Sequence, residues 1–113
     1  MSADYETLML VSIFASFVMR PVVLGINLTE TKRTLYIMSI ALFLIVFCNE
    51  VMEMTTWHVF TYVMSFTMIS AVYDGAYEGG MKHYVKGRVL QYGYLSHIGI
   101  ISGLIAWSTR WTF

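Results

Sequence analysis

Four apolar stretches, separated by short polar connections, follow one another along the chain. They run from about residues 8 to 26, 31 to 54, 57 to 75 and 89 to 107. A helix needs about 20 residues to cross a bilayer, so each stretch is close to the length of one span. The pattern predicts an all-α integral membrane protein, one transmembrane helical domain over residues 1–113 with four transmembrane helices, and three spans are the alternative.

Two local signals refine these boundaries. Arg20-Pro21 lies near the end of the first stretch, where proline lacks a backbone donor and disfavours helix at the residue before it. We therefore expect a kink or an early end there. The long polar connection between the third and fourth stretches, residues 78 to 88, contains the pair Gly79-Gly80, which is typical of a turn.

Composition supports a membrane location and excludes some functions. Apolar residues make up 58% of the chain and charged residues 12%, whereas soluble domains carry roughly twice that charged fraction. Four spans would use almost all of the 113 residues, so no separate soluble catalytic domain fits. Seven basic residues balance seven acidic ones, and this balance gives no basic excess for binding nucleic acid.

The basic residues are distributed unevenly between the two sides of the predicted bundle. Six of them flank the first and third connections, which share a side in a four-span chain, and one falls on the other side. The six are Arg20, Lys32, Arg33, Lys82, Lys86 and Arg88, and the single one is Arg110. Cytoplasmic loops carry the excess of Lys and Arg, so we expect a multi-pass protein of the cell membrane with both termini outside.

Two polar clusters near the predicted span ends could bind a metal or form ion pairs. Glu50 and Glu53 are three residues apart, on one face of a helix, with His58 shortly after them. These side chains could ligate a divalent metal, but the further ligands of a specific site are missing, so we interpret them as interfacial polar groups. Asp74 and Glu78 stand near Lys82 and Lys86, and we expect ion pairs there.

His97 is the ionisable residue that the boundaries place deepest in the bilayer. An ionisable residue inside a membrane is a functional candidate by default, and haem binding or proton transfer are the functional hypotheses. Haem held by two histidines needs a second one at the same depth, and we expect His58 and His83 to lie near the surfaces. A hydrogen bond from His97 to a neighbouring helix is the simpler hypothesis. Cys48, within an apolar run, is interpreted as a small buried side chain.

Small residues in the fourth stretch predict close helix packing. Gly99 and Gly103 form a small-xxx-small pair, which lets another helix approach closely. The packing candidates in this stretch are Gly93, Ser96, His97, Gly99 and Gly103. The sequence contains no dense ligand cluster and no nucleophile–base arrangement, so we predict no catalytic, cofactor-binding or metal-binding residues in this chain, which is then not an enzyme by itself.

Length, short loops and parts of the N-terminal half together resemble one known family. The relevant residues are Ser2-Ala3-Asp4-Tyr5-Glu6, Arg20-Pro21-Val22-Val23-Leu24-Gly25 and Thr31-Lys32-Arg33-Thr34. They resemble the small accessory membrane subunit of archaeal ammonia monooxygenase. The resemblance implies a non-catalytic structural subunit of a complex that oxidises ammonia, with larger membrane subunits as partners and copper held in those subunits. It carries no metal ligand over to this chain.

Two other classes remain as alternatives. Small multidrug exporters also have about this length and four spans, but they depend on a glutamate embedded in the first helix, and residues 8 to 19 contain no acidic side chain. A respiratory membrane anchor that binds haem or quinone would rest on His97. A stoichiometric large partner in the native membrane would favour the subunit, and a lone dimer would favour the exporter.

Overall fold

The structure is a computed structural model that describes residues 4–25 and 29–110. All regular structure in these ranges is helical, which confirms the all-α prediction. The elements are α1 (Tyr5–Val18), α2 (Arg20–Val23), α3 (Glu30–Val46), the π-helical turn η1 (Phe47–Val51), α4 (Thr56–Glu78), the short 3₁₀ turn η2 (Met81–His83) and α5 (Arg88–Thr109).

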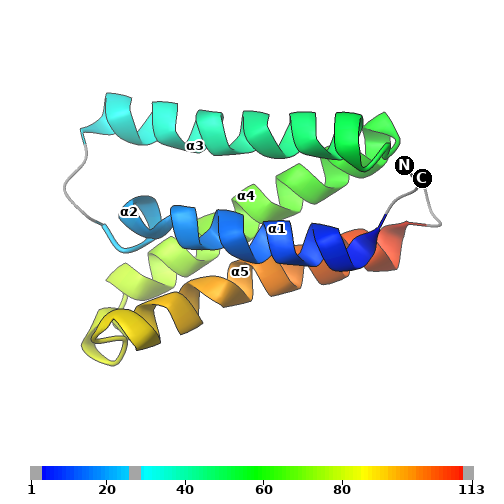
Figure 1. Cartoon of the computed structure of the whole chain (residues 1–113). Helices are drawn as coiled ribbons and strands as arrows, with labels where there is room; N and C mark the ends of the chain where they lie inside the picture. The colour runs from blue at the N-terminus through cyan, green and yellow to red at the C-terminus, as the bar shows by residue number, and fades with distance from the viewer. Residues whose placement is uncertain (1–3, 26–28, 111–113) are drawn as a thin grey trace.

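The four long helices run up and down as an antiparallel bundle (Figure 1). The beginning of α1 and the end of α5 lie at the same end of the bundle, and α3 runs along one side of it. The bundle measures 41 × 27 × 20 Å. Its long axis is comparable with the roughly 40–45 Å of a bilayer that includes its headgroups.

Side-chain caps define where three of the helices begin. Asp4 accepts hydrogen bonds from the backbone N–H groups of Glu6 and Thr7 at the start of α1. Thr29 and Thr55 do the same at the starts of α3 and α4. Such caps satisfy donors that the first helical turn leaves unpaired. The Thr7 hydroxyl also donates to the Asp4 carboxylate at 2.8 Å, and this bond lowers the pKa of Asp4.

The first predicted stretch is broken, as the Arg20-Pro21 pair indicates. Helix α1 ends at Val18, and the chain resumes as α2 after Met19. The N–H of Val22, which would bond to the Val18 carbonyl in a continuous helix, bonds to Met19 O at 3.0 Å. The expected span from 8 to 26 therefore becomes a helix that begins at Tyr5, bends at Met19 and ends at Val23; residue 26 lies outside the described residues.

The other predicted boundaries shift by a few residues. The second stretch, expected to reach residue 54, widens into η1 and ends at Val51, before Glu53 adopts a positive φ of 54°. The third and fourth helices, α4 and α5, extend beyond the expected ends at residues 75 and 107. The ends of these helices depend on tertiary packing and on caps, and hydropathy alone predicts them only to within a few residues.

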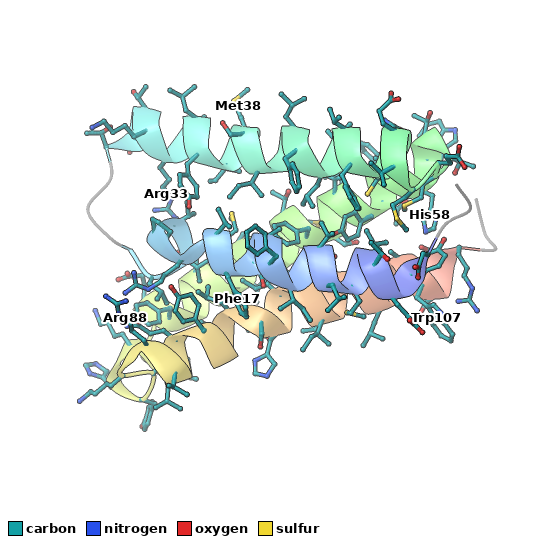
Figure 2. The ribbon with its side chains drawn as sticks, in the orientation of Figure 1. Phe17, Arg33, Met38, His58, Arg88 and Trp107 are labelled. Atoms are coloured by element: carbon teal, nitrogen blue, oxygen red, sulfur yellow. The ribbon has the colours of Figure 1, made fainter. Side chains whose placement is uncertain are left out.

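The core lies mainly where α1, α4 and α5 meet. The fully buried apolar side chains include Leu8, Leu44, Tyr62, Leu95 and Ile98. Helix α3 contributes little to this core, since only 11% of its apolar stretch is buried. Many of its outward side chains are large and apolar, and Figure 2 shows Met38 directed away from the bundle.

Within the described residues, two helices have both the length and the apolar composition of a membrane span. They are Glu30–Val51, formed by α3 with η1, and Arg88–Thr109, which is α5. Helix α1 is shorter, with 14 residues. Helix α4 has 23 residues and is long enough, but polar side chains distributed along it lower its hydropathy. Length and composition therefore support two spans directly, rather than the four that the sequence pattern predicted.

Candidate functional site

His58 lies in the first turn of α4 and points into the bundle, with 3% of the residue exposed. Its Nε2 lies 2.7 Å from the carbonyl oxygen of Ala106 on α5. A carbonyl only accepts, so Nε2 carries a proton, and Nδ1 is hydrogen-bonded to the Tyr5 hydroxyl of α1 at 3.3 Å. The imidazole thus joins three helices at the end of the bundle where Figure 2 labels it.

The structure corrects the interpretation of Glu50, Glu53 and His58 as one interfacial cluster. His58 is buried, because the cap at Thr55 starts α4 with the ring on the inner face. Glu50 is an exposed residue of the π-helical turn, and Glu53 follows the helix end with a positive φ. The two carboxylates therefore do not share one face of a continuous helix.

A second buried polar contact lies halfway along the bundle. The hydroxyls of Ser12 on α1 and Tyr62 on α4 are hydrogen-bonded to each other, and both residues are fully buried. Ser70 and Ser102 are also buried, and each donates to a carbonyl one turn earlier in its own helix. Every buried side-chain polar atom among the described residues has a partner, so this interior is polar in places and fully satisfied.

Charged side chains meet at the opposite end of the bundle. Arg33 of α3 forms an ion pair with Asp74 of α4, and Lys82 pairs with Glu78 at 3.8 Å. The prediction of ion pairs is confirmed for Glu78, whereas the partner of Asp74 is Arg33 rather than a lysine of the connecting loop.

Arg20 also binds within the bundle. Its Nε and one terminal nitrogen donate to Oε1 of Gln91 on α5, at 3.2 and 3.1 Å. The residue is half-buried. The Arg20 guanidinium therefore joins α2 to α5.

The five packing candidates of α5 divide between two faces. Gly99 and Gly103 are buried against α1: a Cβ on Gly99 would lie 2.5 Å from the carbonyl oxygen of Ser12, and one on Gly103 would lie 2.8 Å from the Met9 sulfur. On the other face Gly93 is exposed, and a Cβ there would meet nothing within 4 Å. Ser96 is half-buried and donates to the Gly93 carbonyl at 2.7 Å.

His97 lies on this second face and is exposed. Its ring centroid is 6.2 Å from that of Tyr73 on α4, and the Tyr73 ring packs in turn on Tyr94 at 5.0 Å. Among the described residues, no hydrogen bond joins His97 to a neighbouring helix. The hypothesis of such a bond is therefore wrong within this chain, because the register that buries Gly99 turns His97 outward.

The described ranges, 4–25 and 29–110, contain no group of three or more His, Cys, Asp or Glu side chains that could hold a metal. Cys48 is fully buried in the core, as its apolar surroundings indicate. Both ring nitrogens of His58 are hydrogen-bonded within the bundle. His97, by contrast, is exposed near the middle of α5.

The buried polar groups of α4 were missed at the level of sequence, although a signal for them exists. His58, Tyr62, Phe66 and Ser70 recur every four residues and all are buried. This spacing marks one helical face.

Searches of protein-family models, curated proteins and solved structures give no match to this chain. The class of the protein is therefore described by its fold alone: an all-α bundle of four long helices.

Proposed function

We propose that this chain is an integral membrane protein and that all four long helices cross the bilayer. The surface of α3 supports this proposal, because Leu35, Met38, Leu42 and Phe43 are all at least half exposed. A monomeric soluble protein rarely exposes so continuous an apolar face. Such an apolar face is compatible with the hydrocarbon core of a bilayer.

The polar content of α1 and α4 is compatible with spanning, because several of their polar side chains are buried inside the bundle. Ser12 and Tyr62 are bonded to each other in the core, and His58 is bonded to α1 and α5. A membrane helix can carry polar groups when they are satisfied inside the bundle. The low hydropathy of α4 then reflects its buried face, while its exposed face includes Phe60, Met64 and Met68.

The proposed orientation places the end with Arg33 and Arg88 in the cytoplasm and the end with His58 and Trp107 outside (Figure 2). We expect a cysteine at Glu6, in a Cys48→Ala background, to react with an impermeant thiol reagent from outside intact cells. A cysteine at Lys86 should react only after the cells are opened. Both positions are exposed. The reverse labelling would contradict the orientation, and labelling of both from outside would indicate dual insertion, as in small exporters.

Within the membrane, we propose that the chain is a non-catalytic accessory subunit of a larger enzyme complex. The observation that carries this proposal is the outward imidazole of His97 near the middle of α5. A polar side chain facing lipid at that depth is costly, and a hydrogen-bonding helix of another subunit would remove the cost. Gly93, one turn away, leaves space for such a helix to approach.

The resemblance described above suggests which complex this is. We propose an ammonia monooxygenase of the archaeal type, in which larger subunits hold copper and carry out the oxidation, while this chain packs against them. The partners are then membrane subunits and lipids, and this chain itself supplies no cofactor ligand.

The proposal predicts that His97→Leu and Gly93→Leu weaken the association with partner subunits. A membrane hydrogen bond contributes roughly 0.6–2 kcal/mol, which corresponds to about a 3- to 30-fold loss of affinity. The measurement is the fraction of chain that copurifies with other subunits from native membranes in mild detergent. Leu90→Ile, at an exposed position of the same helix, serves as the control.

Two results would contradict this proposal. If both substitutions left copurification unchanged, the face of His97 would meet only lipid. If His97→Leu left the complex assembled but abolished its activity, His97 would have a functional role and not a packing role.

A further inference from the structure

A groove of about 520 Å³ lies between α1 and α3. Its walls are apolar side chains of both helices, among them Phe14 and Val18 of α1 and Leu35 and Phe43 of α3. Lys32 and Ser39 are polar residues of its lining. The groove is thus an apolar trough with a cation near the basic end of the bundle.

The packing of the two walls on different helices explains why the groove exists. Helix α1 packs on α5 at Gly99, and α3 packs on α4 with Ile40 and Leu44 buried, so α1 and α3 make little direct contact. The Val18 carbonyl accepts no hydrogen bond from the N–H of Val22, which bonds to Met19 instead. It accepts one from the Tyr36 hydroxyl of α3. This bond ties the two walls together near the Lys32 end.

The length of the groove corresponds to one leaflet of a bilayer. Lys32 and Phe43 are 11 residues apart on α3, which at about 1.5 Å per residue is roughly 16 Å. The hydrocarbon core of a bilayer is about 30 Å thick. A hydrocarbon chain of a lipid that enters the groove beside Lys32 would therefore reach the middle of the membrane at Phe43.

The charges around the groove favour an anion at its mouth. Arg33 is paired with Asp74 and Lys82 with Glu78, whereas Lys32 is exposed and forms no ion pair with the described residues. Basic pockets between transmembrane helices on the cytoplasmic side bind anionic headgroups. A cation without an acidic partner, above an apolar trough, matches a lipid with a phosphate at one end and a hydrocarbon chain at the other.

We propose that the groove between α1 and α3 binds one anionic phospholipid, with an acyl chain along the trough and the phosphate at Lys32. This inference rests on the proposed membrane location, but not on the identity of the complex. The lipid would fill the space between the walls and hold α3, the least buried helix of the bundle, in place.

The test uses the full chain in vesicles of equal parts phosphatidylglycerol and phosphatidylcholine, extracted gently and weighed intact by native mass spectrometry. We expect the chain to retain one phosphatidylglycerol in preference to phosphatidylcholine. Lys32→Gln should reduce this preference about fivefold, since one basic residue at the surface contributes on that order. Lys86→Gln, an exposed lysine on the same side, is the matched control.

A second pair of variants tests the trough itself. Ser39→Trp would fill the groove, and Met38→Trp places the same side chain on the outward face of α3 (Figure 2). Ser39→Trp should abolish lipid retention, and Met38→Trp should leave it unchanged. The smaller Ser39→Leu should reduce retention even if the tryptophan disturbs folding, which circular dichroism would reveal.

Three outcomes would overturn the inference. Retention without headgroup preference, or unchanged by both Lys32→Gln and Ser39→Trp, would show that no specific site exists. Crosslinking of a cysteine at Ser39 to another protein, with no lipid retained, would show that a partner helix occupies the groove. Release of the chain from the vesicles by alkaline carbonate would instead refute the membrane location, and the groove proposal with it.

Discussion

Replacing Gly99 with leucine is expected to push α1 away from α5 and to destabilise the bundle strongly. A Cβ at this position would lie 2.5 Å from the carbonyl oxygen of Ser12 and 2.6 Å from the backbone of Ile13. Overpacking against side chains costs about 1–3 kcal/mol. Here the obstacle is backbone, which cannot rotate away, so we expect a loss above about 3 kcal/mol. The measurement is the free energy of unfolding in mixed micelles, followed by circular dichroism.

Gly93→Leu provides the matched control for this experiment. Gly93 lies on the same helix, but a Cβ there has no neighbour within 4 Å. In the isolated chain we expect a change below about 1 kcal/mol, the difference in helix propensity between glycine and other residues. Equal losses for both variants would mean that α5 does not pack on α1 through Gly99.

Tyr62→Ala is expected to destabilise the bundle by roughly 3–5 kcal/mol, the usual cost of deleting a buried aromatic ring. Tyr62 is fully buried, and its hydroxyl is bonded to that of Ser12. The substitution would leave a cavity between α1 and α4 and an unpaired hydroxyl on Ser12. Tyr62→Phe, which keeps the ring, should cost about 1 kcal/mol.

Phe60→Ala removes an aromatic ring from the same helix two residues earlier. Phe60 is 57% exposed, and its ring meets that of Trp57 at 6.3 Å. We expect less than about 1 kcal/mol for this variant. The measurement is the free energy of unfolding of the three variants in one detergent. If Phe60→Ala lowered it as much as Tyr62→Ala, the face of α4 that carries Phe60 would be the buried one, contrary to the structure.

The sequence predicts the helical class well because hydropathy follows burial in a helical chain. It also predicts the bend at Met19, since proline removes a specific backbone donor. It does not predict that α3 with η1 ends at Val51, because the π-helical turn and the positive φ of Glu53 depend on local packing. It could not predict which helices pair either, because short loops permit several arrangements of four helices.

For the candidate site residues, too, the sequence predicts some features and not others. The spacing of Gly99 and Gly103 indicates a close approach, but not that α1 is the helix that approaches. Depth along the sequence suggested that His97 is internal, whereas its position around the helix makes it exposed. His58 was placed near the surface by its closeness to the helix end, yet it is buried. Position along a helix is read from hydropathy, while position around it requires the partner helices.

Helices α1 and α5, which approach closely where Ser12 meets Gly99, come from opposite ends of the polypeptide. A ribosome adds about 5–20 residues per second, so α1 would wait on the order of ten seconds before its partner is synthesised. During this interval the backbone of α1 at Ser12 and Ile13 would lack the helix that packs against it at Gly99. The order of biosynthesis therefore makes α1 the part of the nascent chain that depends most on the insertion machinery, and makes completion of α5 the step that closes the core.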